Sequence, residues 1–371
     1  AEMRAHSPEV SIILPTYNRA DTIRRAIQSV VDQTFQDWEL LVIDDGSTDR
    51  TTELDLEVDP RITLIRQENQ GVYVARNTGL RASRGRYIAF LDSDDEWLPH
   101  LLDLAIGFLK SSPEDQYVSL EFLREDSSYR MIRGAIVDVY LPTAKRIGSR
   151  ALELPPGETD DYLRVFDSKQ AIGPWGAKLL SEASASEAAL YQGNIFHLTP
   201  WGYFGWLPTT VLTRHASSVV GEFDPSRRSA GDYAFQALLS RHFRTNLISV
   251  PSARKHERAS AHEEVREDHL ALGPNYYVFR TNRLYFFDQV HGSGPHADSE
   301  VSLIRRLYVY DTGRLAMELG MRNEALRHFT EAACLHRLLW RAYVLRILTF
   351  MCWSDRMTSR LYQLLRRLRF V

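Results

Sequence analysis

Short apolar runs alternate with amphipathic segments over residues 10–110, and this alternation constrains the fold more than any other feature of the sequence. The runs with the length and composition of buried strands are Val10–Leu14, Leu40–Ile43, Ile62–Ile65 and Tyr87–Leu91. Helical spacing is found in residues 21–30, with a predicted cap at Asp21, and in residues 72–82 and 98–109. Strands that alternate with helices in this way form mostly parallel sheets with helices on both faces. The sequence therefore predicts an α/β fold built on a mostly parallel, Rossmann-like sheet.

Polar residues follow three of these apolar runs directly. The tetrapeptide PTYN (residues 15–18) follows the first run, Asp44-Asp45 follows the second, and DSDD (residues 92–95) follows the fourth. Open sheets of this kind bind ligands at the carboxyl ends of their strands. We therefore expect a binding site along this edge of the sheet.

The acidic turn Asp92-Ser93-Asp94-Asp95 has the chemistry of a metal site. Carboxylates held at a strand end can meet one divalent cation and its phosphates, and Mg²⁺ and Mn²⁺ prefer oxygen ligands. An Asp-x-Asp motif alone is more often a solvated acidic turn or a helix cap. Both interpretations remain open at this point.

Three other segments could bind a nucleotide. A carboxylate in Asp44-Asp45-Gly46-Ser47 could accept an N–H from a base edge, while Tyr17 could stack on the base. Arg76, in a predicted helix, could point at a diphosphate. Each segment also has a plainer interpretation. Asp44-Asp45-Gly46-Ser47 could be a turn with helix capping by Ser47, Tyr17 could lie in a surface turn, and Arg76 could lie on a solvated helix face.

Asp232 opens a helix predicted over Gly231–Arg244. A carboxylate in the first turn of a helix often does no more than offset the helix dipole. It could also be the general base that an acceptor hydroxyl needs. The sequence pattern alone leaves these two roles open.

Taken together and in this order, the motifs resemble those of the family 2 glycosyltransferases, which have the GT-A fold. The matching stretches are VSIILPTYNR (10–19), LLVIDDGST (40–48), NQGVYVARNTGL (69–80), AFLDSDDEW (89–97) and VGEFDPSRRSAGD (220–232). The resemblance is closest over about residues 10–110, looser over about 205–245 and slight beyond about 260. It implies a GT-A catalytic domain over residues 1–258, with a nucleotide half (about 10–110) and an acceptor half (about 111–258). A helical C-terminal region, residues 259–371, follows.

The resemblance also implies a role for each site residue. The donor-binding residues would be Pro15, Thr16, Tyr17, Asp44, Asp45, Arg76, Asp92 and Ser93, with Asp45 accepting from the base N3–H. Asp94 would bind Mn²⁺ or Mg²⁺ with help from Asp92 and from His256, which could equally be a solvated surface histidine. Asp232 would be the general base. The family often has Glu-Asp where this chain has Gly231-Asp232.

The implied reaction is inverting transfer of a sugar from a nucleotide diphosphate to a hydroxyl group. UDP-sugars are the expected donors, although an acidic residue on a base N–H does not exclude thymine or guanine. The expected acceptor is a glycan or lipid-linked glycan, in the synthesis of polysaccharide or lipopolysaccharide. Trp201 and Trp206 could form an acceptor platform, and buried core aromatics account for them equally well.

Other enzyme classes fit the sequence less well. A sugar nucleotidyltransferase would want a phosphate loop rich in glycine and basic residues after the first strand, and a dinucleotide oxidoreductase would want GxGxxG there. The chain has PTYN at that point. A non-catalytic nucleotide-sugar-binding module is the remaining rival, and the presence of Asp92, Asp94 and Asp232 argues against it.

The net charge and the cysteine content indicate which partners and which cellular compartment to expect. The net charge of −3 does not suggest a nucleic-acid partner. Two distant cysteines, no signal-peptide core at the N-terminus and arginines within Leu338–Trp353 favour a cytoplasmic protein without a spanning helix. Residues 301–371 carry 13 arginines and five acidic residues, a balance of +8. These helices could contact an anionic membrane on its inner face, or simply form a helical cap with a solvated basic face.

Overall fold

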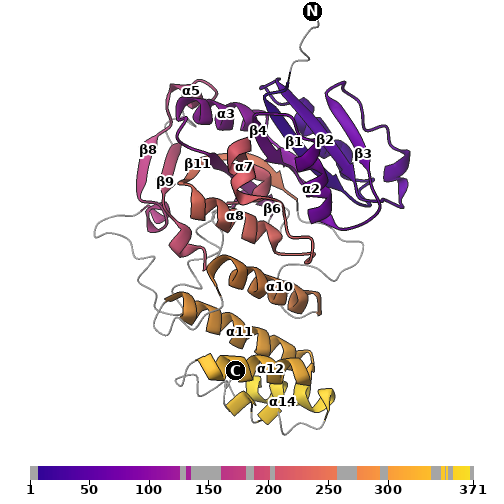
Figure 1. Cartoon of the computed structure of the whole chain (residues 1–371), viewed down its shortest axis with the longest axis vertical. Coiled ribbons are helices and arrows are strands. Elements are labelled where there is room, and N and C mark those ends of the chain that lie inside the picture. Colours follow the sequence, from indigo (N-terminus) through magenta and orange to yellow (C-terminus); the bar gives the residue numbers. More distant parts are fainter. Residues whose placement is uncertain are drawn as a thin grey trace, which may run out of the picture. The chain divides into compact units, whose positions relative to one another are not determined.

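A computed structural model gives the fold of the chain (Figure 1). The structure describes residues 7–125, 131–134, 160–180, 188–200, 205–256, 274–292, 300–335, 344–346, 348–349 and 354–367. The chain divides into two compact units, Ala1–Arg258 and Ala259–Val371. Each unit is described by itself.

A single mixed sheet forms the frame of the first unit. Its strands are β1 (Val10–Thr16), β2 (Trp38–Asp44), β3 (Ile62–Arg66), β4 (Tyr87–Phe90), β5 (Glu96–Trp97), β6 (Tyr117–Glu125), β7 (Met131–Gly134), β8 (Ser168–Ala171), β9 (Ala189–Gly193), β10 (Thr210–Thr213) and β11 (Thr245–Lys255). The order across the sheet is β3-β2-β1-β4-β10-β6-β11-β9-β8, with β5 on β11 and β7 on β6. Strands β1 to β4 are parallel, as predicted, and so are β6 and β11. Strand β10 runs antiparallel between β4 and β6, so the second half of the sheet is mixed.

Helices and short 3₁₀ turns connect these strands. The helices are α1 (Ile23–Val31), α2 (Val72–Ala82), α3 (Leu101–Ser111), α5 (Pro174–Ala177), α7 (Arg214–Val220) and α8 (Gly231–His242). The 3₁₀ turns are η1 (Arg50–Glu53), η2 (Asp161–Arg164), η3 (Phe196–Leu198) and η4 (Leu207–Thr209). Helix α2 has its predicted bounds. The predicted cap at Asp21 is wrong, because Thr22 is the residue before α1 and no side chain caps that helix.

The third helix also begins later than predicted. The segment before it pairs with β11, since Trp97 lies opposite Ala253 and the N–H of Leu98 donates to the carbonyl of Ser252 at 2.8 Å. A sheet contact so distant in sequence overrides local helical spacing. The acidic turn is thereby held between β4 and the short strand β5.

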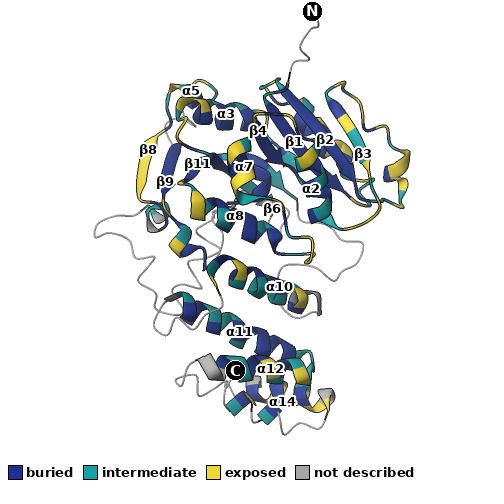
Figure 2. Ribbon diagram, in the orientation of Figure 1, coloured by how far each residue is buried: buried dark blue, intermediate teal, exposed yellow. Residues whose placement is uncertain are grey.

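Both faces of the sheet are buried, because successive side chains of a strand point to opposite faces. Ile12 and Leu14 of β1 pack into one cluster with α1 and α3, whereas Ile13 packs with α2 and α8 in a second cluster. Every residue of β1 and β2 is buried, while all four residues of the edge strand β8 are exposed (Figure 2). The core therefore lies under the parallel strands that carry the acidic turn.

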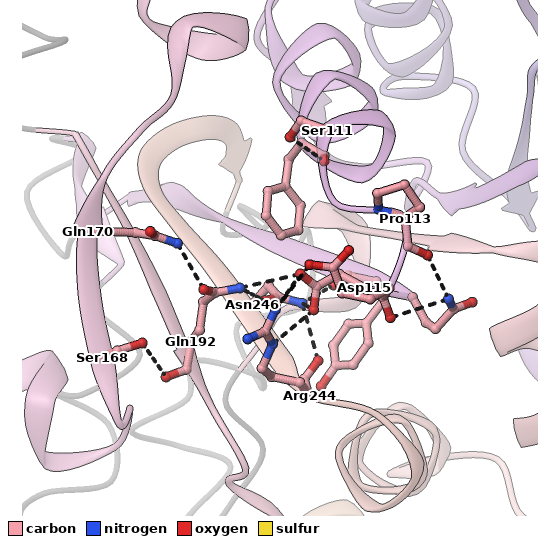
Figure 3. Close-up of polar contacts among 12 residues, drawn as sticks. Ser111, Pro113, Asp115, Ser168, Gln170, Gln192, Arg244 and Asn246 are labelled. Atoms are coloured by element: carbon pink, nitrogen blue, oxygen red, sulfur yellow. Dashed lines mark hydrogen bonds and ion pairs between the residues drawn. The ribbon is translucent and has the colours of Figure 1, made fainter.

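A buried polar cluster joins β6, β9 and β11 near the start of β6 (Figure 3). Asp115 accepts two hydrogen bonds from Arg244, at 3.0 and 2.8 Å, and a third from Asn246 at 3.1 Å. The side chain of Gln192 donates to Asn246 at 2.7 Å. Because β6 and β4 both run antiparallel to β10, this cluster lies at the amino ends of the strands, away from the acidic turn.

The second unit is helical in its described parts. Its helices are α10 (Pro274–His291), α11 (Glu300–Glu318), α12 (Arg322–Leu335) and α14 (Asp355–Arg367). Helices α11 and α12 approach closely at Gly313, where an added Cβ would lie 2.9 Å from the ring of Phe329. Among the residues that the structure describes, no helix has the length and apolar character needed to cross a bilayer.

Candidate active site

The loops after β1 and β2 are joined by main-chain and asparagine contacts. The N–H of Asp45 donates to the carbonyl of Thr16 at 2.9 Å, which extends the pairing of the two strands by one residue. Asn18 has a left-handed backbone with φ of 53°, and its side-chain oxygen accepts from the N–H of Thr48 at 2.8 Å. Its own N–H donates to Ser47 at 3.0 Å. Asparagine tolerates this conformation better than most residues, so the first loop is fixed against the second.

The two aspartates after β2 face different partners within the protein. Asp44 accepts the N–H of Ser47 at 2.9 Å, which closes its own loop. Asp45 is buried and accepts from the side chain of Gln67 at 2.8 Å and from the N–H groups of Gln70 and Gly71 at 3.0 and 2.8 Å. Asp45 therefore ties the loop after β2 to the loop that leads into α2.

Gly46 allows these two loops to approach each other. Its φ is +76°, and a Cβ at this position would lie 2.8 Å from the backbone nitrogen of Asn69. A side chain here would meet both a left-handed backbone and a backbone clash. Beside this junction the hydroxyl of Thr16 is buried with no hydrogen-bond partner in the described structure, while Tyr17 is exposed.

The carboxylates of the acidic turn after β4 are contacted by two arginine side chains and by the backbone of His256. Arg76 donates to Asp92 at 2.7 Å, and the Arg19 guanidinium lies 3.4 Å from the Asp94 carboxylate. The backbone N–H of His256 donates to Asp95 at 3.1 Å. Ser93 is buried within the turn. The structure thus brings Asp92, Asp94 and His256 to one turn, with arginines beside two of the carboxylates.

Two carboxylates of this turn, Asp94 and Asp95, bind protons more readily than usual because they are buried and lie near other negative charges. Burial and the nearby negative charge of Asp92 raise the pKa of Asp94 above its ordinary value. Burial, together with the charges of Asp92 and Asp94, raises the pKa of Asp95 well above its ordinary value. Like charges in a partly buried site favour a compensating cation or a bound proton.

The donor set fits a hard divalent cation, since it consists of carboxylate oxygens under mutual repulsion. Within the described ranges, however, no three His, Cys, Asp or Glu side chains form a ready-made metal site. The ring of His256 lies 3.7 Å from the Glu96 carboxylate. Asp92 and Asp94 are therefore the residues that could hold a cation, and both have arginine neighbours.

Arg76 connects the acidic turn with Asp232. Its side chain is buried, and its guanidinium packs 5.8 Å from the Tyr73 ring centre and 5.4 Å from that of Phe223. Burial acts to lower the pKa of Arg76, but the negative charges of Asp92 and Asp232, with the nearby Tyr73 hydroxyl, outweigh it and raise the pKa above its ordinary value. Arg76 thus pairs with Asp92 and packs on Tyr73, whose hydroxyl accepts the N–H of Gly231 at 2.6 Å, so a chain of contacts joins the acidic turn to the start of α8.

Asp232 lies in the first turn of α8 and is partly buried. Its Oδ1 accepts the N–H of Tyr233 at 3.0 Å, while Ala230, the residue before α8, has a left-handed backbone with φ of 64°. A left-handed alanine is uncommon, so the entry into α8 is held in a conformation that its neighbours must stabilise.

The motifs alone did not identify four residues of this site. Asn18 joins two loops, Arg19 approaches Asp94, and Glu96 pairs with Arg254 beside His256. Tyr73 contacts the start of α8 through its hydroxyl. All four lie inside the quoted motifs, but nothing in their local sequence indicates these long-range partners.

The aromatic segment predicted as an acceptor platform is described only in part. Trp201 lies outside the described residues. Trp206 is partly buried, with its ring centre 4.6 Å from that of Phe122, so it packs against the core.

Comparisons with known proteins show what the first unit is similar to. Residues 11–156 match the model of Glycosyl transferase family 2. A glucosyltransferase of Escherichia coli, UDP-Glc:alpha-D-GlcNAc-diphosphoundecaprenol beta-1,3-glucosyltransferase WfgD, is 46% identical over 121 residues, which cover 32% of this chain and 48% of that protein. The putative teichuronic acid biosynthesis glycosyltransferase TuaG of Bacillus subtilis is 42% identical over 106 residues, 28% of this chain and 42% of that protein. The chain thus spans less than half the length of these two relatives.

The fold is also found in a solved structure. That of TarS 1–349 from S. aureus in complex with UDP-GlcNAc matches with a TM-score of 0.55 and 15% identity, covering 97% of this chain and 92% of that one. At this identity the match concerns the fold alone. With the family match over the first strands and the acidic turn, it supports one conclusion: the chain carries a glycosyl transferase family 2 domain with the GT-A fold.

Proposed function

We propose that this chain is an inverting glycosyltransferase that moves a sugar from a nucleotide diphosphate to an acceptor hydroxyl. The observation that carries the proposal is a chain of contacts: Arg76 pairs with Asp92 and packs on Tyr73, whose hydroxyl accepts the N–H of Gly231 next to Asp232. A leaving-group site and a general base have to lie on two sides of the same reacting carbon. The contacts through Arg76 and Tyr73, which join the acidic turn to the first turn of α8, support this arrangement.

The proposed reaction is a direct displacement at the anomeric carbon. The acceptor oxygen forms a bond to that carbon while the bond from the carbon to the diphosphate oxygen breaks. Asp232 takes the acceptor proton, and the nucleotide diphosphate leaves with the bonding electron pair. One carboxylate base and no second carboxylate in the role of nucleophile correspond to inversion.

Asp92 and Asp94 are the proposed ligands of Mn²⁺ or Mg²⁺, and His256 is the proposed third ligand. When bound, such an ion offsets the negative charge that grows on the leaving diphosphate. Arg19 and Arg76 would have to share or release these carboxylates, and each guanidinium could then bind a phosphate oxygen. Before the donor binds, the ion pairs Arg76–Asp92 and Arg19–Asp94 partly compensate the negative charge of the two carboxylates.

A UDP-sugar is the proposed donor. The relative WfgD is named as using UDP-Glc and a diphosphoundecaprenol-linked acceptor. On this side of the site, Asp44, Asp45 and the buried hydroxyl of Thr16 lie at the carboxyl ends of β1 and β2, where a base is expected. Pro15 lies among the buried last residues of β1, before Thr16, and Tyr17 is exposed just after the strand as a stacking surface. We propose a glycan or lipid-linked glycan as acceptor, in the synthesis of a surface polysaccharide.

The test is transfer and donor hydrolysis with a panel of nucleotide sugars, with and without Mn²⁺. Asp232→Asn is expected to lower kcat at least ~100-fold with donor affinity retained, because loss of a general base costs about 10²–10⁴-fold. Asp94→Asn is expected to weaken metal-dependent donor binding. Asp311→Asn, on an exposed ion pair of α11, is the control.

Activity of Asp232→Asn at the wild-type level would remove the base from the mechanism. Donor binding without any turnover by the wild type would favour the non-catalytic module.

Helix α14 offers a surface that fits an anionic membrane. Met357 and Leu364, seven residues apart, are 45% and 53% exposed, and Arg360 lies exposed between them. Apolar side chains beside arginine suit the headgroup region of anionic lipids. We propose peripheral contact there, tested by flotation with phosphatidylglycerol vesicles. Binding by wild type and its loss in Met357→Gln/Leu364→Gln would support the contact, and equal flotation of the two would contradict it.

A further inference from the structure

The start of α8 is capped by a side chain from a different helix. No side chain of its own flanking residues caps the helix. The N–H of Gly231 instead donates to the hydroxyl of Tyr73 at 2.6 Å. Tyr73 lies in α2, 158 residues away in sequence. The first N–H groups of a helix lack intrahelical partners, so such a contact fixes the first turn.

The Tyr73 ring also explains the glycine before Asp232. A Cβ at position 231 would lie 2.7 Å from Cζ and 2.8 Å from Cε2 of Tyr73. Gly231 does not have a positive φ, so space rather than backbone conformation requires glycine there. The ring fills the volume in which a side chain before Asp232 would lie. This accounts for the departure from the Glu-Asp pattern noted in the sequence.

The ring is itself held firmly. Tyr73 is 4% exposed and stacks on Phe223 with an interplanar angle of 3°, and Phe223 stacks in turn on Phe235 of α8 at 4.5 Å. The guanidinium of Arg76 packs against the rings of Tyr73 and Phe223, and it also pairs with Asp92. A displacement of the ring would therefore be transmitted to both sides of the proposed site.

The hydroxyl keeps its proton at working pH. Burial, and then the negative charge of Asp232, raise the pKa of Tyr73 far above its ordinary value. A neutral hydroxyl accepts the Gly231 N–H without placing a second negative charge beside Asp232.

We propose that Tyr73 is a positioning residue of the transfer reaction, which acts through the Gly231 amide to hold the carboxylate of Asp232 toward the acceptor. This inference rests on the proposed function, because it assigns Asp232 the role of base. Tyr73 touches neither donor nor acceptor in this scheme. Its contribution is to the orientation of the first turn of α8.

Tyr73→Phe keeps the ring and its stacking and removes only the hydroxyl. We expect kcat to fall about tenfold, the loss that corresponds to about one capping interaction, with the donor KM within about twofold of wild type. Tyr117→Phe is the matched control, because its hydroxyl bonds Ser240 at 3.2 Å at the other end of the same helix. That variant should lose stability and keep kcat.

The glycine allows an independent test by rescue. Gly231→Ala should lower kcat more than Tyr73→Phe does, because the new Cβ meets the ring. Adding Tyr73→Ser should restore part of that loss, since serine removes the ring, whereas adding Tyr73→Phe should restore none. This comparison remains decisive even if one single variant folds poorly.

The outcomes separate the inference from the proposed function. Wild-type kcat in Tyr73→Phe, with Asp232→Asn inactive, would overturn the inference and leave the function standing. An equal fall of kcat in Tyr73→Phe and Tyr117→Phe would show a merely structural hydroxyl and overturn it too. Full activity of Asp232→Asn would remove the proposed function, and the inference with it.

Discussion

Arg76 donates a hydrogen bond to Asp92 at 2.7 Å from a side chain that is itself almost completely buried. The negative charge of Asp232 also helps to keep Arg76 protonated. The Arg76–Asp92 ion pair is therefore part of the structure of the site as well as of its proposed chemistry. A buried cation that loses its partner retains its desolvation cost without compensation.

Breaking this pair should therefore destabilise the first unit. We expect Asp92→Asn to lower the free energy of unfolding by about 3 kcal/mol. The double variant Arg76→Met/Asp92→Asn should cost less than the sum of the single changes, because it removes the buried charge with its partner. Urea unfolding measures both losses.

Arg81 and Glu222 are the matched control pair, since they also form a 2.7 Å contact from α2 but are 59% and 47% exposed. Breaking that exposed pair should cost at most about 1 kcal/mol. Equal losses at the two pairs would contradict the argument from burial.

Two glycines inside helices should respond to alanine with opposite signs. At Gly79 of α2 a Cβ would lie 2.4 Å from Cγ2 of Ile13, so Gly79→Ala should destabilise by about 1–3 kcal/mol through overpacking. At Gly107 of α3 the nearest atom, in Trp175, is 3.4 Å away. Gly107→Ala should therefore stabilise by about 0.5–1 kcal/mol, because alanine is the better helix former. Thermal melting of the two variants gives the signs directly, and a stabilising Gly79→Ala would show that α2 can move away from β1.

The polar cluster around Asp115 should contribute to stability without affecting transfer. Asp115→Asn replaces an acceptor of several N–H groups with one that presents its own amide hydrogens. We expect a loss of about 2–3 kcal/mol in the free energy of unfolding. Because the cluster lies at the amino ends of the strands, kcat per folded molecule should stay at the wild-type level. A lowered kcat in fully folded Asp115→Asn would contradict this separation of the two edges of the sheet.

The helical unit should lose stability in mild acid through His328. This side chain is 2% exposed and hydrogen-bonds to Tyr277 at 3.0 Å. Burial and the neighbouring charge of Arg327 lower its pKa to about 4. Because the unfolded chain binds the proton near pH 6.5, the stabilising contribution is complete above about pH 6.5 and is lost as the pH falls toward 4. The full effect is about 3 kcal/mol by order of magnitude.

Comparison with His328→Gln isolates this effect from the titration of carboxylates. Glutamine keeps a polar group for Tyr277 and does not titrate in this range. The melting temperature of the helical unit should therefore fall more steeply for wild type than for the variant between pH 7 and pH 4.5. Parallel curves would exclude His328 as the acid-sensitive group.

Local pattern determined the elements that carry the site. The apolar runs around Ile12, Leu41 and Ala89 became β1, β2 and β4, and the helix over Val72–Ala82 has its predicted bounds. The polar residues after those runs could be placed at one edge because parallel strands end on the same side. These predictions needed only side-chain periodicity and the connection rules of α/β sheets.

Long-range packing decided the rest. The position of β10 between β4 and β6, the approach of Arg19 to Asp94 and the contact of Tyr73 with Gly231 depend on residues far apart in sequence. No local pattern encodes such pairings, because each depends on which side chains fill the space that the whole core leaves. The sequence by itself therefore determined the parallel strands and the carboxylates at their ends. Only the tertiary structure decided which cation lies beside each carboxylate and why residue 231 must be glycine, since a clash or an ion pair exists only once distant segments share the same volume.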